Sequence, residues 1–381
     1  MDAERQGSAR AGPRPLAYYL RVAAAAAAAR RAPGGRKIDL ERFLAGLRAY
    51  WRHAYRRNVS EPAAVWCQGG ARLLDHTGEG LPILMVPSLV NRAYILDLSA
   101  ERSFLRHLAR CGFRPLLLDW GLPRGAELHL TMADQILSRA QAALDAALDL
   151  TGERPILLGY CMGGLLAAAL ARARHRDLAG LALLATPWDF HAEAFSPVLF
   201  AERVLPLTAS VAGLGFAPVE LLQAFFAQLD PLRVVEKFQR FAEMPAHSAR
   251  ARLFVAVEDW LNDGVPLAGP VAQECLWHWY AENRPARGHW APGGVAVRPE
   301  ELDLPAFVAI PRRDRIVPAA SAEPLAAGLP GATVIRPAAG HVSMVIGDAA
   351  PAELWRPFTD WLRRIAPRRS SRPVRPASVN L

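Results

Sequence analysis

Short apolar runs alternate with segments of helical spacing along most of the chain. The apolar runs predict strands at residues 64–68, 71–75, 82–86, 115–119, 156–158, 180–185, 306–310 and 332–335. The helical spacing predicts helices at residues 39–57, from about 93 to 110, at 134–150, directly after residue 161, at 319–328 and at 352–365. Strands and helices in alternation predict an α/β fold, with a mostly parallel sheet and helices on both of its faces.

The alternation is interrupted from about residue 188 to residue 298 by an apolar, mainly helical segment rich in Phe, Leu and Trp. An insertion before the last two strands of such a sheet corresponds to an α/β-hydrolase fold with a helical cap. The predicted organisation is an N-terminal leader and amphipathic helix at 1–60, a core at 61–187 and 299–366, a cap at 188–298 and a disordered basic tail at 367–381. Within the leader, residues 1–36 are predicted to be flexible, with room for one alanine helix.

The composition fits a globular protein, because 381 residues that are 52% hydrophobic can bury a large core. The net charge of +9 comes almost entirely from arginine. An anionic partner is one interpretation of that charge, but a general arginine bias concentrated in the two tails is favoured. Basic residues do not alternate with aromatic ones in an RNA-binding pattern, so no nucleic-acid partner is expected.

The four cysteines lack short paired spacings, which argues against a disulfide framework or a zinc ribbon and favours a reduced, cytoplasmic setting. Cys275, His278 and His289 lack the tight spacing of a metal site. Neither a metal nor another cofactor is therefore expected. The apolar run at 16–29 is interrupted by Arg21, so it predicts no signal peptide, and no run is long enough for a transmembrane helix.

A candidate nucleophile lies where the strand at 156–158 runs into Gly159-Tyr-Cys-Met-Gly163 and then a helix. This strand–turn–helix pattern is a nucleophile elbow, with cysteine in the usual place of serine. The tight turn requires Gly159 and Gly163, because a side chain at either position would collide with neighbouring backbone. Cys161 is predicted to be strained and accessible, at a helix N-terminus that favours the thiolate.

A cysteine nucleophile needs a base and a group that orients the base, and in α/β-hydrolases they follow in the order acid, then histidine. Of ten histidines, only His341 lies in a loop directly after a final strand and before the last helix. Asp314 follows the preceding strand. We therefore predict a triad of Cys161, Asp314 and His341.

The oxyanion hole of such a triad is predicted to use two backbone N–H groups. One belongs to Met162, directly after the nucleophile. The other belongs to the loop after the strand at 82–86, where Ser88, Leu89 and Val90 are the alternatives and Leu89 is taken as the candidate.

Several of these stretches resemble the polyhydroxyalkanoate synthases, and the resemblance spans roughly residues 45–365. The similar segments are Val86-Pro-Ser-Leu-Val-Asn-Arg-Ala-Tyr-Ile-Leu-Asp-Leu98, Asp119-Trp-Gly-Leu-Pro123, the cysteine box Gly159–Gly164, Glu258-Asp-Trp-Leu-Asn-Asp263, Asp314-Arg-Ile-Val-Pro318 and Gly340-His341. The chain departs from the family pattern at Ser88, where a second Pro is common, and at Arg315, where His is frequent. Its short form is most similar to the catalytic subunit of the two-component synthases.

The resemblance implies an acyltransferase that polymerises (R)-3-hydroxyacyl-CoA into polyhydroxyalkanoate, with release of CoA and an acyl-cysteine intermediate. CoA would then be part of the substrate rather than a resident cofactor. The implied partners are the growing polyester and its granule surface in the cytoplasm. The resemblance also allows a helical accessory synthase subunit and a homodimer.

Two alternatives use the same fold. A thioesterase or polyester depolymerase would carry the same triad, because water and an alcohol compete for one acyl-enzyme. A granule-associated protein without catalytic activity would keep the fold alone.

Overall fold

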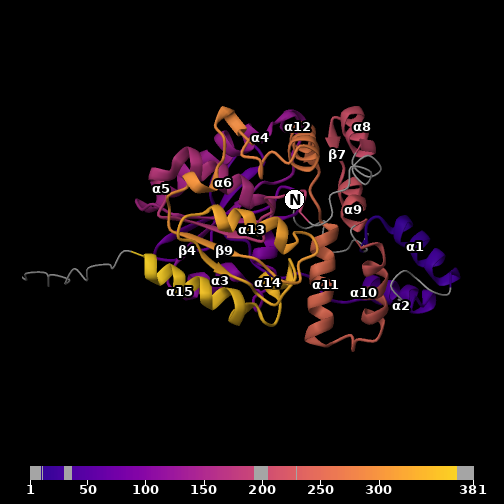
Figure 1. Cartoon of the computed structure of the whole chain (residues 1–381). Coiled ribbons are helices and arrows are strands. Elements are labelled where there is room, and N and C mark those ends of the chain that lie inside the picture. Colours follow the sequence, from indigo (N-terminus) through magenta and orange to yellow (C-terminus); the bar gives the residue numbers. More distant parts are fainter. Residues whose placement is uncertain (1–9, 11, 30–36, 193–204, 229, 367–381) are drawn as a thin grey trace, which may run out of the picture.

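The computed structural model describes residues 10, 12–29, 37–192, 205–228 and 230–366. The tail predicted to be disordered, 367–381, lies outside these residues, as does most of the segment 1–11. Figure 1 shows a central sheet with helices on both of its faces and a group of further helices at one end. The fold is therefore the predicted α/β architecture.

The main sheet has eight strands in the order β1-β2-β4-β3-β5-β6-β9-β10. The strands are β1 Ala63–Gln68, β2 Ala71–Asp75, β3 Pro82–Val86, β4 Arg114–Asp119, β5 Ile156–Tyr160, β6 Gly180–Leu184, β9 Ala306–Ala309 and β10 Thr333–Ile335. β1 and β2 form the predicted hairpin, and β2 is also antiparallel to β4. All other neighbouring strands of this sheet are parallel. The prediction of a mostly parallel sheet is confirmed.

The central strands are buried on both faces, and this explains why they appear in the sequence as unbroken apolar runs. Along β3, Leu84 and Val86 belong to one core cluster, while Ile83 and Met85 belong to the other. Figure 1 shows α5 and α6 over one face of the sheet, and α3 and α15 over the opposite face. Because successive side chains of a strand point to opposite faces of the sheet, each central strand contributes to the hydrophobic core on both faces.

The helices of the core follow the predicted alternation. They are α3 Phe104–Arg110, α4 Met132–Asp134 with the π-helical η5 Gln135–Ala140 and α5 Gln141–Thr151, α6 Met162–Arg174, α13 Ala319–Gly328, α14 Ser343–Ile346, and η10 Pro351–Trp355 with α15 Arg356–Ile365. Within the described residues, no helix is both long enough and apolar enough to span a membrane.

The helix predicted from about residue 93 to Arg110 is wrong in its first half. Only a 3-10 turn, η3 Ala93–Leu96, forms there, and α3 begins at Phe104. The Ser103 side chain accepts from the Arg106 amide at 2.9 Å and so caps a new helix. The carboxylate of Asp97 binds the Arg106 guanidinium at 2.7 Å and holds the intervening turn against α3.

The segment between β6 and β9, here called the cap, is mainly helical in its described part. Its elements are α8 Leu205–Leu214, β7 Phe216–Ala217, α9 Val219–Ala227, α10 Pro231–Ala242, α11 Ala249–Asn262, β8 Leu267–Ala268, α12 Gly269–Glu274 and the π-helical η7 Cys275–Ala281. β7 and β8 pair as a small antiparallel sheet.

The two N-terminal helices pack on the cap rather than on the sheet (Figure 1). They are α1 Leu16–Ala28, inside the segment predicted to be a flexible leader, and α2 Leu40–Arg52, which is shorter than predicted. Asp39 caps the N-terminus of α2, because its side chain accepts from the Arg42 amide at 3.0 Å. Both helices share a hydrophobic cluster with α10 and α11, built around Phe43, Tyr50 and Phe238.

The turn between β5 and α6 is as tight as the sequence predicts. A Cβ atom at Gly159 would lie 2.4 Å from the Gly164 Cα atom, and one at Gly163 would lie 2.1 Å from the Val86 carbonyl oxygen. Both distances are shorter than any real Cβ contact. The elbow therefore packs backbone to backbone against the end of β3.

We expect Gly163→Ala to lower the free energy of unfolding by about 1–3 kcal/mol, because the new methyl group must push β3 and α6 apart. Gly213→Ala in α8 is the matched control, since its added methyl group would meet none of the described residues within 4 Å. Chemical denaturation of both variants measures the difference. Equal stability of the two variants would contradict the close approach.

Candidate active site

Cys161 occupies the apex of the elbow, between the last residue of β5 and the first residue of α6. Its backbone has φ 57° and ψ −129°, a conformation that costs a non-glycine residue about 1–3 kcal/mol. The Cys161 amide donates to the carbonyl of Leu184 in β6 at 2.8 Å, which helps to hold this strain. The side chain is only partly buried, so the strained and accessible position predicted for it is present.

Asp314 and His341 meet although 27 residues separate them along the chain. Asp314 lies in the loop after β9, and His341 lies in the loop between β10 and α14. The His341 Nδ1 atom is 2.6 Å from the Asp314 Oδ2 atom, and both side chains are buried. The other carboxylate oxygen accepts from the amides of Ile316 at 2.8 Å and Val317 at 3.0 Å. Both oxygens of Asp314 are thus engaged.

His341 also lies close enough to Cys161 for the charge of the thiolate to act on it. Burial alone would lower the pKa of His341, but the negative charges of Cys161 and Asp314 and the hydrogen bond to Asp314 raise it to about 10. The environment therefore favours the imidazolium form of His341. A protonated imidazole next to a thiol stabilises the thiolate, which is the nucleophilic form of cysteine.

Tyr160, which the sequence analysis did not select, contacts His341 and holds it in position. Its hydroxyl group donates to the His341 carbonyl at 3.2 Å, and the two rings stack with their centroids 5.2 Å apart. Tyr160 is buried at the end of β5, directly before the nucleophile. The local sequence gives no sign of this role, because position 160 is a variable position of the elbow motif and the partner of Tyr160 lies 181 residues away.

The loop after β3 lies beside the elbow, as the predicted oxyanion hole requires. The amide of Val90 donates to the Ser88 Oγ atom at 3.3 Å, so this amide is engaged. Among the described residues, no acceptor binds the amides of Ser88 or Leu89. The Leu89 side chain faces a small separate cavity beside Trp120, whereas Ser88 lines the same cavity as Cys161. Ser88 and Leu89 therefore remain the two candidates for the second N–H donor, with Met162 as the first.

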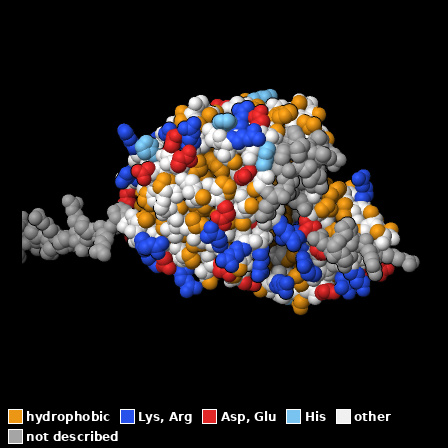
Figure 2. Space-filling model, viewed as in Figure 1, with side chains coloured by type: hydrophobic (Ala, Val, Ile, Leu, Met, Phe, Trp, Pro, Cys, Tyr) orange, Lys and Arg blue, Asp and Glu red, His pale blue; other side chains and the backbone are white. Residues whose placement is uncertain are grey.

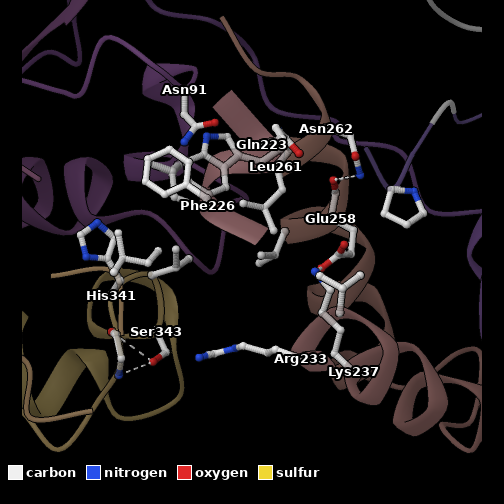
Figure 3. A pocket seen from close by; sticks show the side chains of 18 of the residues that line it. Asn91, Gln223, Phe226, Arg233, Lys237, Glu258, Leu261, Asn262, His341 and Ser343 are labelled. Atoms are coloured by element: carbon white, nitrogen blue, oxygen red, sulfur yellow. Dashed lines mark hydrogen bonds and ion pairs between the residues drawn. The ribbon is translucent and has the colours of Figure 1, made fainter. Parts of the chain in front are cut away.

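A cavity of about 740 Å³ opens from Cys161 and His341 into the interface between the core and the cap. Figure 3 shows His341 and Ser343 on the wall formed by the core, opposite Glu258 and Lys237 of the cap. Phe226 and Leu261 lie between these walls and give the middle of the cavity an apolar lining. Such a cavity can hold an acyl chain and exclude water from it.

The N-terminal segment contributes to the wall of this cavity, which the sequence did not indicate. Pro13, Arg14 and Tyr19 line it. The segment is held by the indole N–H of Trp51, which donates to the Gly12 carbonyl at 2.6 Å, and by the Arg14 amide, which donates to Asn262 Oδ1 at 2.8 Å. Residues that the sequence assigns to a leader thus close one side of the cavity.

The described residues contain no group of three or more His, Cys, Asp or Glu side chains that could hold a metal ion. Asp314 and His341 bind each other, and the negative charge of Cys161 acts on His341. The structure thus brings together the three side chains that the sequence predicts as a triad, a thiol, an imidazole and a carboxylate.

Comparison with known proteins shows which family the chain resembles. The family described as "alpha/beta hydrolase fold" matches residues 82–348. The chain is 30% identical over 309 residues to a poly(3-hydroxyalkanoate) polymerase subunit PhaC from Haloferax mediterranei, which covers 78% of this chain and 62% of that protein. It is 26% identical to the subunit of the same name from Allochromatium vinosum, over 74% of this chain and 80% of that protein.

The sequence resemblance to this group of proteins is therefore confirmed, although the chain spans only 62% of the length of the Haloferax relative. Among solved structures, a thermophilic esterase from Thermogutta terrifontis aligns with 82% of this chain and 100% of its own. That alignment has a TM-score of 0.49 and 21% sequence identity.

We expect Asp314→Asn to lower the pKa of His341 from about 10, because the substitution removes a negative charge that favours the imidazolium form. The imidazolium would then lose its proton at a lower pH. Titration of the ring nitrogens by nuclear magnetic resonance measures this shift. Asp348→Asn, which removes an exposed carboxylate paired with Arg102, is the control and should leave the titration unchanged. An unchanged pKa in Asp314→Asn would contradict the charge coupling.

Proposed function

This chain belongs to the α/β-hydrolase fold family, and within that family we propose that it is an acyltransferase that polymerises (R)-3-hydroxyacyl-CoA into polyhydroxyalkanoate and releases CoA. The observation that carries the proposal is a cysteine at the elbow that shares a largely apolar cavity with the buried His341–Asp314 pair and is coupled to His341 by charge. The names of the similar polymerase subunits support the same reaction.

In the first step, the thiolate of Cys161 attacks the carbonyl carbon of the thioester. The N–H group of Met162 and that of Leu89 or Ser88 stabilise the negative charge that forms on the oxygen. The carbon–sulfur bond to CoA then breaks, and the imidazolium of His341 gives its proton to the leaving thiolate. An acyl group on Cys161 remains, with neutral His341 beside it.

In the second step, the hydroxyl group of another hydroxyacyl unit gives its proton to His341 and attacks the acyl group on Cys161. An ester bond forms, the bond to the Cys161 sulfur breaks, and the thiolate–imidazolium pair is restored. Asp314 orients His341 and stabilises its positive charge in both steps. No cofactor or metal is needed for either step.

The cysteine itself favours transfer from a thioester. Exchange of one thiolate for another changes the free energy little, so an acyl-cysteine can persist until an alcohol arrives. The apolar cavity under the cap would keep water from competing with that alcohol. A serine in this position would be equally compatible with acyl transfer and with ordinary ester hydrolysis.

The proposal extends to the setting of the enzyme. The growing polyester would remain close to the cavity, so we propose that the protein works at the surface of polyester granules in the cytoplasm. A helical accessory subunit and a homodimer are further proposed partners.

We expect Cys161→Ala to lower the rate of CoA release from 3-hydroxybutyryl-CoA by at least about a thousandfold, because the variant lacks the thiolate that attacks the thioester. Cys67→Ala, which changes an exposed cysteine on β1, is the control and should retain full activity. Release of CoA is followed with a thiol reagent. Full activity of Cys161→Ala would reject Cys161 as the nucleophile, whereas absence of CoA release from wild-type protein would support a granule protein without catalysis.

Analysis of the acyl product separates the proposed reaction from hydrolysis. We expect wild-type protein to form a polyester of high mass from 3-hydroxybutyryl-CoA, because a hydroxyl group reaches the acyl-cysteine before water does. Size-exclusion chromatography and the assay of free 3-hydroxybutyrate measure the two products. Free acid without polymer would replace the proposal with a thioesterase that uses the same triad.

A further inference from the structure

A group of basic side chains surrounds the mouth of the cavity that leads to Cys161. Of the residues that the structure describes, eight arginine and lysine residues line this cavity, but only two carboxylates do, Asp230 and Glu258. Six of the basic residues lie on α10, on α11 and in the Asp314 loop, and we call them the basic rim: Arg233, Lys237, Arg240, Arg250, Arg313 and Arg315. All of them except the half-buried Lys237 are exposed, and Figure 2 shows Lys and Arg side chains gathered around a hollow on this face.

Helix α10 provides three of the six residues of the basic rim, in a row, or stripe, along one face of the helix. Arg233, Lys237 and Arg240 are four and three residues apart, so they lie on one face of the helix and span about 10 Å along its axis. The opposite face of α10 buries Val235, Phe238 and Phe241 against the N-terminal helices. The packing of α10 on α1 and α2 therefore turns the basic stripe toward the cavity.

Much of the charge of the rim is not neutralised. Lys237 binds Glu258 at 2.6 Å, and Arg315 binds Asp230 at 2.5 Å. For the guanidinium groups of the other four rim residues, the described part of the chain provides no ion pair. Figure 3 shows Arg233 extended across the cavity toward the loop of Ser343. Arginines that converge on a mouth without carboxylate partners are suited to bind phosphate groups.

We propose that the basic rim binds the diphosphate and the ribose phosphate of CoA while the pantetheine arm reaches into the cavity toward Cys161. The inference rests on the proposed function, which supplies the thioester. The phosphate groups of CoA are separated along the molecule, and the length of the α10 stripe allows them to be bound at separate points. A growing polyester carries no phosphate, so the rim distinguishes incoming substrate from retained product.

The basic rim also shows that the positive charge of this chain is not confined to its tails. The sequence favours a general bias that concentrates positive charge in the tails. The structure instead gathers part of it at the entrance to the candidate nucleophile, where electrostatic attraction can guide a polyanionic substrate.

The test neutralises three exposed rim arginines of the cap and leaves the Asp314 loop intact: Arg233→Gln, Arg240→Gln and Arg250→Gln in one protein. The matched control removes three exposed arginines that do not line the cavity: Arg48→Gln, Arg110→Gln and Arg176→Gln. Both proteins lose the same net charge. Release of thiol is measured with 3-hydroxybutyryl-CoA and with the N-acetylcysteamine thioester of 3-hydroxybutyrate, which lacks every phosphate group.

We expect the rim variant to lose about tenfold or more in kcat/KM with the CoA thioester, since several phosphate contacts disappear together. With the phosphate-free thioester it should match wild-type protein, as the control variant should with both substrates. Added salt should lower kcat/KM of wild-type protein for the CoA thioester more than that of the rim variant. An equal loss with both thioesters, or no loss with either, would overturn the proposal.

The result does not depend on the fate of the acyl group, because thiol release is counted whether polymer or free acid forms. Failure of polymerisation therefore leaves the test of the rim intact. If wild-type protein is inert toward both thioesters, titration calorimetry with free CoA decides the same question. Binding to wild-type and control proteins but at least tenfold weaker binding to the rim variant supports the rim, and equal binding to all three, or no binding to any, rejects it.

Discussion

The site depends on one close approach between two pieces of backbone. Helix α6 can leave β5 directly only because Gly159 leaves room for the backbone of Gly163 and Gly164, and because Gly163 lets the elbow contact the end of β3 at Val86. This contact fixes Cys161 in its strained conformation and brings the loop that follows β3 close to the nucleophile. The position of Cys161, its place at the N-terminus of α6 and its closeness to the loop after β3 therefore all depend on the absence of a side chain at Gly159 and Gly163.

The parallel sheet then brings the other groups to the nucleophile. β5, β9 and β10 run in the same direction, so the loops after their carboxyl ends meet at one edge of the sheet. Asp314 is held there by two loop amides as well as by His341, which leaves the carboxylate little freedom to rotate. The buried pair acts together with Tyr160, whose ring and hydroxyl group fix the position of the His341 loop.

Much of this follows from the sequence, because the signals involved are local. A strand buried on both faces is a short apolar run, and the elbow is a pattern of five residues, so β3, β5 and the position of Cys161 could be predicted. The prediction of a helix from about residue 93 was wrong because the Ser103 side chain binds a backbone amide and starts a new helix there, which the apolar spacing does not reveal. The support of His341 by Tyr160 and the wall formed by Pro13 depend on contacts between distant residues, which a single sequence does not contain.

The packing of the N-terminal helices has a consequence for motion. Because α1 and α2 share a hydrophobic cluster with α10 and α11, these four helices form a unit that would be displaced together. The ion pair between Asp230 and Arg315 ties this unit to the loop of the orienting acid. Opening of the cavity along α10 would therefore be a collective displacement on the microsecond-to-millisecond timescale, rather than the rapid fluctuation of a single loop. Access to Cys161 would then depend on the N-terminal part of the chain as much as on the cap.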